Sequence, residues 1–445
     1  MSPPPARTTR RTELTVTALC FAVIVFDGYD LIIYGATLPG LLEYRDWGLT
    51  KTEAGAIGSY ALIGMLVGAL VAGTVTDLIG RRKVMMIGVA WFSLAMIGCA
   101  LAPSPTWFGL FRMIAGLGLG GVMPTAVALT AEHSRADRRS LNNAIMFSGY
   151  SVGGVLAAVL TMNLMPEYGF RVMYWTAAAP LLLVPVLWRL LPESESFLAA
   201  RGRHEKPKRA DLGWGDDPPH PPEELAGSEG PAVPPRRLGV TALFERRHLM
   251  PTLLFALTSF LGLLLVYGLN TWLPQIMKSA GFPLSSSLLF LVVMNAGAVV
   301  GTVLVAPLGD RLGMKPVTAS AFLTAAVSIT LLSFATAEPL MYVLVAVAGF
   351  GTVGTQIMIN AYVAMHFPAE IRATALGWTL GIGRLGAILG PTFGGYLLAA
   401  DIDVSWNFYA FAIPATLGVA LVLFLPAKEK AAGAVPSRAG ARQPA

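Results

Sequence analysis

The segment 23–34 reads Val-Ile-Val-Phe-Asp-Gly-Tyr-Asp-Leu-Ile-Ile-Tyr and places two aspartates, Asp27 and Asp30, within an apolar run from Leu14 to Leu42. A run of this length predicts a membrane-spanning helix, since about 20 apolar residues cross a bilayer. A carboxylate at that depth is costly, so its presence indicates a functional site. Three residues apart on a helix, the two side chains point about 60° from each other. The segment therefore predicts a membrane protein that moves a solute and uses protons to do so.

The composition extends this prediction to the whole chain. Of its residues, 55% are hydrophobic and only 13% are charged, whereas about 25% of the residues of a soluble domain are charged. Apolar runs long enough to cross a bilayer recur along the chain, so we expect an all-α membrane protein with twelve transmembrane helices. The expected spans are residues 14–42, 52–76, 84–102, 105–131, 141–165, 171–191, 249–277, 284–308, 315–336, 338–365, 373–399 and 404–426.

Two short motifs divide the chain into similar halves. Asp310-Arg311-Leu312-Gly313 follows Asp77-Leu78-Ile79-Gly80 by 233 residues, and Glu370-Ile371-Arg372 follows Asp137-Arg138-Arg139 by the same 233. Equal offsets at two separate loops indicate a duplicated six-helix unit. Such repeats place the ligand site near the bilayer midplane between the two halves.

A segment rich in proline, glycine and charge, residues 192–247, separates the halves. It has too few apolar residues to order itself, so we expect a mostly disordered linker. Basic residues gather in both tails, in this linker and in the loops on the same side, and the positive-inside rule then places both termini in the cytoplasm. The net charge of +6 is therefore a topology signal and not a sign of nucleic-acid binding. The expected order is a tail (1–13), an N-terminal half (14–191), the linker (192–247), a C-terminal half (248–426) and a second tail (427–445).

Two acids and two arginines are the leading candidates for transport chemistry. Asp27 and Asp30 cannot both ionise cheaply in a low-dielectric site, so we expect them to titrate as a pair and carry a proton, with Asp30 slightly favoured. Arg384 lies deep in an expected span, and its planar fork matches a substrate carboxylate; an ion pair with an aspartate is the alternative. For Arg112 the preferred role is the opposite one: we expect an ion pair with the aspartates, and contact with the substrate is the alternative.

Aromatic and amide side chains within the spans are further candidates for a binding site. Gln356 and Asn360 are four residues apart and share a helical face, where they would orient a ligand or join neighbouring helices. For each aromatic residue, ordinary packing is the alternative to ligand contact. The candidate substrate-binding residues besides the arginines are Tyr34, Asn270, Trp272, Gln356, Asn360 and Trp378, and further possible ring walls are Tyr29, Phe147, Tyr150, Tyr267 and Tyr362.

Motifs for other chemistry are missing from the sequence. We find no His/Cys/carboxylate spacing typical of a metal site within the spans and no nucleotide-binding glycine loop. We therefore expect no metal, no cofactor and no enzyme activity, and ATP-driven transport is not supported.

The segment 73–83, Gly-Thr-Val-Thr-Asp-Leu-Ile-Gly-Arg-Arg-Lys, resembles the loop signature of the major facilitator superfamily. It departs from that pattern at Leu78, where the family usually has Arg or Lys. The resemblance implies a loop that latches one conformation of the transporter. The residues of the expected latch are Gly73, Asp77, Gly80 and Arg81, with Asp310 and Arg311 in the second copy.

A narrower resemblance covers both halves. Phe26-Asp27-Gly28-Tyr29-Asp30, Asn270-Thr271-Trp272-Leu273-Pro274 and the segments 372–378 and 383–391 resemble the first, seventh and eleventh helices of the aromatic acid:proton symporters, and the first two helices look most like the benzoate-carrying branch. The resemblance implies a protein in the lipid bilayer of the inner (plasma) membrane that imports a small aromatic carboxylate of benzoate, hydroxybenzoate or protocatechuate type with protons, by alternating access. We expect a monomer, because the site needs only the two halves of one chain. Another organic anion or a drug exported in exchange for protons is the alternative, and two buried arginines argue against a cationic cargo.

Overall fold

The computed structural model describes residues 10–135, 138–194, 196–198, 240–334 and 337–425. The side chains of residues 140, 302–307, 309–310 and 369–370 also lie outside the description. Most of both expected tails and most of the expected 192–247 linker therefore lie outside the described residues.

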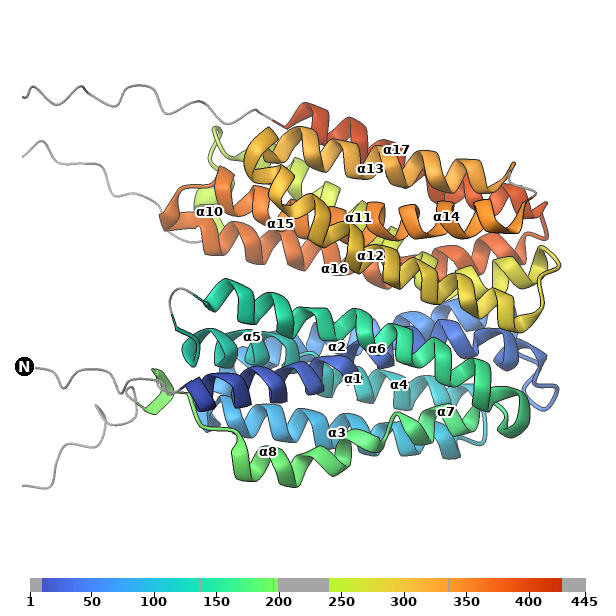
Figure 1. Cartoon of the computed structure of the whole chain (residues 1–445), viewed down its shortest axis with the longest axis horizontal. Helices are drawn as coiled ribbons and strands as arrows, with labels where there is room; N and C mark the ends of the chain where they lie inside the picture. Colours follow the sequence, from blue (N-terminus) through green and yellow to red (C-terminus); the bar gives the residue numbers. More distant parts are fainter. Residues whose placement is uncertain (1–9, 136–137, 195, 199–239, 335–336, 426–445) are drawn as a thin grey trace, which may run out of the picture.

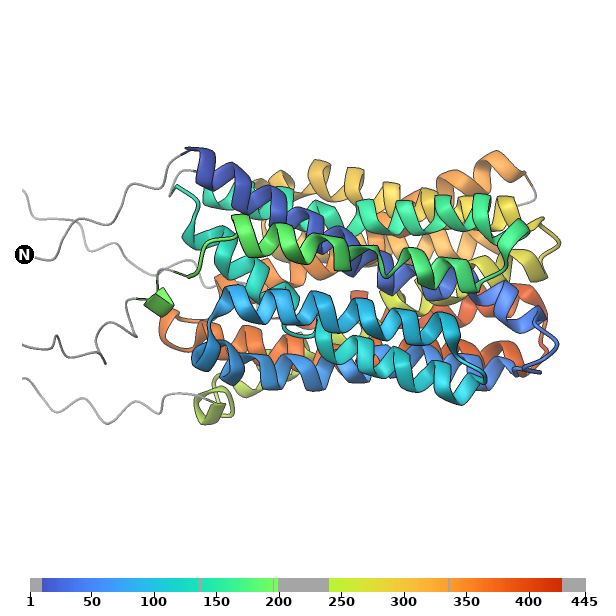
Figure 2. The same cartoon turned by 90° about the horizontal axis from the view of Figure 1, so that it is seen from below.

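The described residues form helices and no strands, gathered into two groups that lie side by side (Figures 1 and 2). The first group comprises α1 (Arg10–Glu43), α2 (Lys51–Ile79), α3 (Arg81–Leu101), α4 (Pro105–Leu119), α5 (Val122–Glu132), α6 (Arg139–Tyr168), α7 (Arg171–Thr176), η1 (Ala179–Leu183) and α8 (Val184–Leu190). The second comprises α10 (Val240–Leu243), α11 (Leu249–Ser279), α12 (Leu284–Leu312), α13 (Met314–Leu332), α14 (Glu338–Gly349), η2 (Phe350–Gly354), α15 (Thr355–His366), α16 (Ala369–Ala399) and α17 (Val404–Phe424). We call the two groups the N-half and the C-half.

The helices have the length and composition of membrane spans. Within the described part of the chain, 11 helical segments are long and apolar enough to cross a bilayer, with α4 and α5 forming one segment and α14 to α15 another. The helix α16, which carries Arg384, is not among these 11. The expectation of an all-α membrane protein is confirmed.

Local sequence explains where several helices begin. Thr50 caps α2, because its hydroxyl accepts from the Glu53 amide at 3.2 Å while the Glu53 carboxylate accepts from the Thr50 amide at 3.0 Å. Gly80 joins α2 to α3 with φ 92°, and Gly313 joins α12 to α13 with φ 94°. Both lie in the left-handed region that favours glycine. The two glycines are 233 residues apart, so the sequence repeat reappears as the same turn in each half.

The two ends of the bundle differ in how the halves meet. We call the end where α1 begins and α17 finishes the tail end, and the opposite end the far end (Figure 1). Toward the far end, α1 packs on α11 and α2 on α16 at glycines. A Cβ on Gly35 would overlap the backbone of Asn270, and one on Gly55 would lie 2.7 Å from the Pro391 carbonyl oxygen and 3.0 Å from the Cα of Gly395. We call this close backbone contact of α2 with α16 and α1 with α11 the far-end seam.

Polar contacts reinforce the far-end seam. The Lys51 ammonium donates to the Leu398 carbonyl at 2.9 Å, and Lys278 pairs with Glu43 at 2.5 Å. Each contact joins one half to the other at the far end.

A serine extends the seam toward the middle of the bundle. The Ser59 hydroxyl of α2 donates to the Ile388 carbonyl of α16 at 2.5 Å and lies 2.7 Å from the Thr392 hydroxyl. The hydroxyl thus satisfies a backbone acceptor on the opposite half.

At the tail end, the described ion pairs stay within one half. Arg81 at the start of α3 pairs with Glu132 at the end of α5. The buried Glu13 of α1 accepts from the Asn142 amide at 2.7 Å and lies 3.8 Å from Arg135. These contacts stabilise the N-half internally.

Candidate functional site

The two aspartates of α1 are both fully buried but differ in their partners. Asp30 pairs with Arg112 of α4, whose guanidinium also lies 3.4 Å from the Asp30 carbonyl oxygen. Neither carboxylate oxygen of Asp27 has a hydrogen-bond partner in the described part of the protein. The structure therefore separates the two acids into one buried ion pair and one carboxyl group without a hydrogen bond.

The Asp30–Arg112 pair belongs to the interior of the N-half. Arg112 is 1% exposed, and its guanidinium carbon lies 5.4 Å from the centre of the Tyr34 ring. The Tyr34 hydroxyl donates to the Ala54 carbonyl at 2.5 Å. The groups that contact Arg112 thus come from the N-half, and this arrangement suits a charge partner for Asp30.

Arg384 approaches Asp27 from the opposite half. Its side chain is half-buried on α16 and interacts electrostatically with Asp27. Within the described residues, Arg384 makes no hydrogen bond or ion pair at contact distance. Asp27 therefore has two charged neighbours: the interaction with Asp30 of its own helix is the larger, and the interaction with Arg384 crosses between the halves.

Two tyrosines complete the group around Asp27 and Arg384. Tyr150 on α6 and Tyr267 on α11 interact electrostatically with each other, with Asp27 and with Arg384. Packing fixes this position, because a Cβ on Gly28 would overlap the Tyr150 carbonyl, so α6 lies directly against α1. We call Asp27, Tyr150, Tyr267 and Arg384 the central cluster. The sequence indicated the tyrosines only as possible ring walls, and their pairing required the fold.

Two amide side chains of the C-half, Gln356 and Asn360, contact each other and leave one hydrogen-bond acceptor without a donor. The Gln356 amide nitrogen donates to the Ser259 hydroxyl at 3.1 Å and to the Asn360 side-chain oxygen at 3.3 Å. The Gln356 side-chain oxygen is buried and lacks a partner among the described residues. The indole nitrogen of Trp378 is likewise buried without a partner, while its ring packs edge-on against Phe244 at 5.2 Å.

Two other sequence candidates lie in tightly packed positions near the far-end seam. Trp272 is fully buried, and its indole nitrogen donates to the Pro391 carbonyl at 2.7 Å. The Asn270 amide donates to the Val266 carbonyl at 2.7 Å and accepts from Asn295 at 3.2 Å. In this conformation their polar groups serve the packing of the C-half.

The expected latch residues lie at the tail end, and those whose side chains are described form no ion pair with one another. Arg81 pairs with Glu132 rather than with Asp77, and both Asp77 and Gly73 are exposed on the last turns of α2. Arg311 is exposed near the end of α12. The side chain of Asp310 lies outside the described residues.

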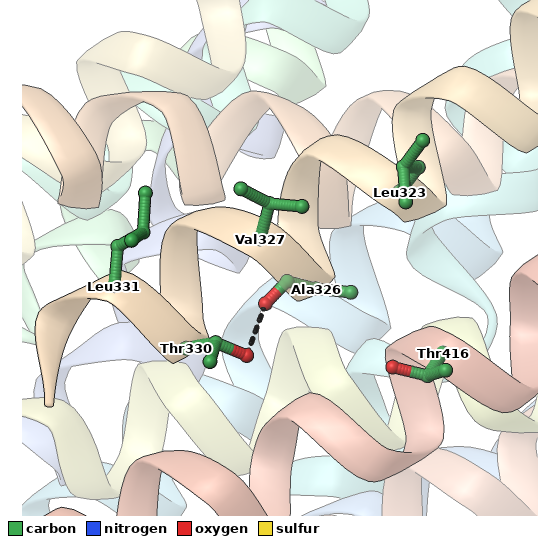
Figure 3. A pocket seen from close by; sticks show the side chains of 6 residues that line it. All are labelled: Leu323, Ala326, Val327, Thr330, Leu331 and Thr416. Carbon is green, nitrogen blue, oxygen red and sulfur yellow. Dashed lines mark hydrogen bonds between the residues drawn. The ribbon is translucent and has the colours of Figure 1, made fainter.

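A groove of about 240 Å³ lies elsewhere, between α13 and α17 (Figure 3). Leu323, Val327 and Leu331 on its rim are 45–52% exposed, and the Thr330 hydroxyl is used by its own helix, bonding the Ala326 carbonyl at 2.7 Å. The lining has no charged group to hold an anion. The groove therefore belongs to the outer apolar surface of the C-half and not to the central cluster.

Comparisons with known proteins identify the family. The family model described as the Major Facilitator Superfamily matches residues 20–335 and 291–445. The benzoate transport protein of Acinetobacter baylyi is 38% identical over 92% of this chain and 89% of its own length. The gentisate transporter of Corynebacterium glutamicum is 36% identical over 91% of this chain and 86% of its own. Among solved structures, a D-xylose–proton symporter has the same fold, with a TM-score of 0.70 at 18% identity over 93% of this chain and 97% of its own. The chain belongs to the major facilitator superfamily, as a multi-pass inner-membrane transporter of the group that includes the aromatic acid transporters.

Proposed function

We propose that the protein imports small aromatic carboxylates together with protons. The observation that carries this proposal is Asp27, a fully buried carboxyl that has no hydrogen bond among the described residues and interacts electrostatically with Arg384 of the other half. A buried carboxylate needs a cation or a proton as its partner. When a substrate carboxylate pairs with Arg384, it neutralises the Arg384 charge that acts on Asp27, so Asp27 takes up a proton. Competition for one arginine thus couples substrate binding to protonation.

The remaining candidates have separate roles in this cycle. Arg384 holds the substrate carboxylate through two hydrogen bonds. The side-chain oxygen of Gln356 accepts from a ring hydroxyl, and Asn360 keeps the Gln356 amide in place. Arg112 balances the charge of Asp30 throughout. We therefore assign the transported proton to Asp27 and the internal charge balance of the N-half to Asp30.

The proposed topology has twelve spans, with α16 as the additional one. Its length of 31 residues is sufficient to cross a bilayer, and it packs against α2 and α11, which are candidate spans themselves. Basic residues gather at the tail end, including Arg81, Arg82 and Lys83, so this end lies in the cytoplasm. The far-end seam then closes the external side, and the conformation is inward-facing.

The exposed latch residues fit the opposite conformation. Asp77 and Arg311 are exposed at the end of the bundle that would have to close for the external side to open. Their charges are then available to tie the tail end together. Because the two halves that form the central cluster belong to the same chain, the proposed transport unit is a monomer.

The relatives narrow the substrate class. Proteins named as carriers of benzoate and of gentisate are similar to this chain over about nine-tenths of its length. Both ligands combine one carboxylate with one aromatic ring. This supports a substrate with a single carboxylate on a small aromatic ring, matched to one arginine.

Uptake by purified protein in liposomes tests the proposal. Radiolabelled benzoate, 4-hydroxybenzoate and gentisate are supplied outside at acidic pH with a neutral lumen, and uptake into liposomes without protein is subtracted. We expect saturable accumulation of at least one acid, competition among the acids, and loss of accumulation in Arg384→Gln. Active, sealed proteoliposomes that accumulate no aromatic acid would refute the substrate class.

A further inference from the structure

Ser59 of α2 joins the two halves close to the level of Arg384. Arg384, Ile388 and Thr392 follow one another at intervals of four residues, so they share one face of α16. The Ser59 hydroxyl lies 2.5 Å from the Ile388 carbonyl oxygen and 2.7 Å from the Thr392 hydroxyl. Four residues of a helix rise about 6 Å. The halves are therefore hydrogen-bonded to each other about one helical turn from the proposed carboxylate anchor.

Thr392 differs from two other buried threonines in the bond that its hydroxyl makes. The hydroxyls of Thr161 and Thr318 each donate to the carbonyl four residues earlier on their own helix, both at 2.7 Å. This is a common bond for a threonine inside a helix. For Thr392 the corresponding acceptor is the Ile388 carbonyl, which accepts from Ser59 of the other half instead. Ser59 thus occupies the acceptor that Thr392 would use on its own helix.

Ser59 also has a second acceptor on its own helix. Its hydroxyl lies 3.3 Å from the Gly55 carbonyl oxygen, four residues earlier on α2. A hydroxyl carries a single proton, and the shorter bond to Ile388 takes it while the halves are in contact. When α2 and α16 separate, Ser59 is able to donate to Gly55, and Thr392 is able to donate to Ile388.

The number of hydrogen bonds is then the same whether the far-end seam is closed or open. With the seam closed, the Thr392 hydroxyl donates to Ser59, and Ser59 donates to Ile388. With the seam open, each hydroxyl donates to a carbonyl of its own helix. A polar group that loses its partner in an apolar environment is costly. This exchange avoids that cost during both opening and closing.

The other half of the repeat has no such hydroxyls. The positions equivalent to Ser59 and Thr392, 233 residues away, are Val292 of α12 and Val159 of α6. The exchange is therefore specific to the contact of α2 with α16. Since valine occupies the equivalent position on α6, Thr392→Val is a conservative change in packing.

We propose that Ser59 and Thr392 are positioning residues of the transport cycle, and that their hydroxyls exchange partners each time the far-end seam opens or closes. Either hydroxyl is able to satisfy the Ile388 carbonyl, so neither one alone determines whether the seam is closed. This inference rests on the alternating access of the proposed function and does not depend on which ligand is carried.

Ser59→Ala, Thr392→Val and the double variant test the exchange. In each single variant the remaining hydroxyl makes one hydrogen bond in either conformation, so the ratio of open to closed protein should stay within about 1.5-fold of the wild type. In the double variant the closed seam loses its donor to the Ile388 carbonyl, whereas water reaches this carbonyl when the seam is open. The ratio should then rise by about twofold to tenfold, which corresponds to one net hydrogen bond.

The ratio is measured from the distance between spin labels at Asp46→Cys and Ile402→Cys, exposed far-end positions of opposite halves, with the two native cysteines replaced by serine. Thr318→Val is the control, because this buried hydroxyl bonds its own helix within the C-half, and the ratio should not change. A second double variant, Ser59→Ala with Thr392→Ser, keeps one hydroxyl and should match the wild type. Thermal unfolding verifies that each variant is folded.

The outcomes separate this inference from the proposed function. If the wild type shows one unchanged distance with and without benzoate at acidic and neutral pH, the far end does not open, and both fail. If two populations exist and either single variant shifts the ratio as much as the double variant, the exchange is overturned while alternating access stands. A double variant with the wild-type ratio also overturns it, because the hydroxyls then have no part in the transition.

Discussion

Gly55 offers the sharpest perturbation of the closed far end. In Gly55→Ala, the new Cβ would lie 2.7 Å from the Pro391 carbonyl oxygen and 3.0 Å from the Gly395 Cα, and real Cβ atoms do not come closer than about 3.0 Å. Both neighbours are backbone, so neither moves without shifting α16. Overpacking of this kind costs about 1–3 kcal/mol. Since α2 and α16 belong to opposite halves, this cost destabilises the conformation in which the far-end seam is closed. The equilibrium between closed and open conformations then shifts toward the open one by about fivefold to 150-fold.

The distance between two spin labels measures how the populations of the closed and open far end change. Labels at Asp46→Cys and Ile402→Cys, exposed positions of opposite halves at the far end, are placed in a background with Cys20 and Cys99 replaced by serine. We expect Gly55→Ala to increase the population of long distances. Gly377→Ala is the control, because a Cβ there on α16 meets no atom within 4 Å. An unchanged distance distribution in folded Gly55→Ala protein would refute the reasoning.

Three further predictions concern stability and closure. Arg112→Gln should lower the thermal unfolding midpoint strongly, since breaking a buried pair costs about 3–5 kcal/mol, and adding Asp30→Asn should restore part of the loss; no recovery in the double variant would argue against the pair. Trp272→Phe should cost about 1–3 kcal/mol by removing its donor to the α16 backbone, measured by denaturation in detergent, and an unchanged midpoint would contradict this. Lys278→Gln should change the far-end distances little, because its partner Glu43 is 66% exposed and such an exposed ion pair contributes at most about 1 kcal/mol to the closed conformation. A complete opening in this variant would show that the pair dominates the seam.

Much of the architecture was predictable from the sequence for clear physical reasons. Long apolar runs leave a helix as the only way to satisfy the backbone in a bilayer. The repeated loops placed Gly80 and Gly313 at equivalent positions, and both adopt the same left-handed turn. The interruption of the tenth expected span by a π-helical turn at Phe350–Gly354 had no such signal, and this turn lies against α13, where a Cβ on Gly351 would come within 2.7 Å of the Ala325 nitrogen.

The sequence indicated which residues belong to the candidate site but not which of them contact each other. The sequence marked Asp27 and Asp30 as a pair with Asp30 slightly favoured, yet only the folded structure decides that Arg112 of α4 meets Asp30. Trp272 fits the pattern of a ring wall, but the Pro391 carbonyl of α16 supplies a backbone acceptor that holds its indole. Contacts between residues more than a hundred positions apart, such as Ser59 with Thr392, follow from helix placement and leave no local pattern.

The central claim is that Asp27 couples the proton to the substrate. Accumulation of a labelled aromatic acid under an acid-outside gradient is compared with exchange against unlabelled acid at equal pH, for wild type, Asp27→Asn and Asp30→Asn. An asparagine side chain cannot gain or lose a proton, so we expect Asp27→Asn to lose accumulation and retain exchange. Accumulation by Asp27→Asn at the wild-type level would contradict the account.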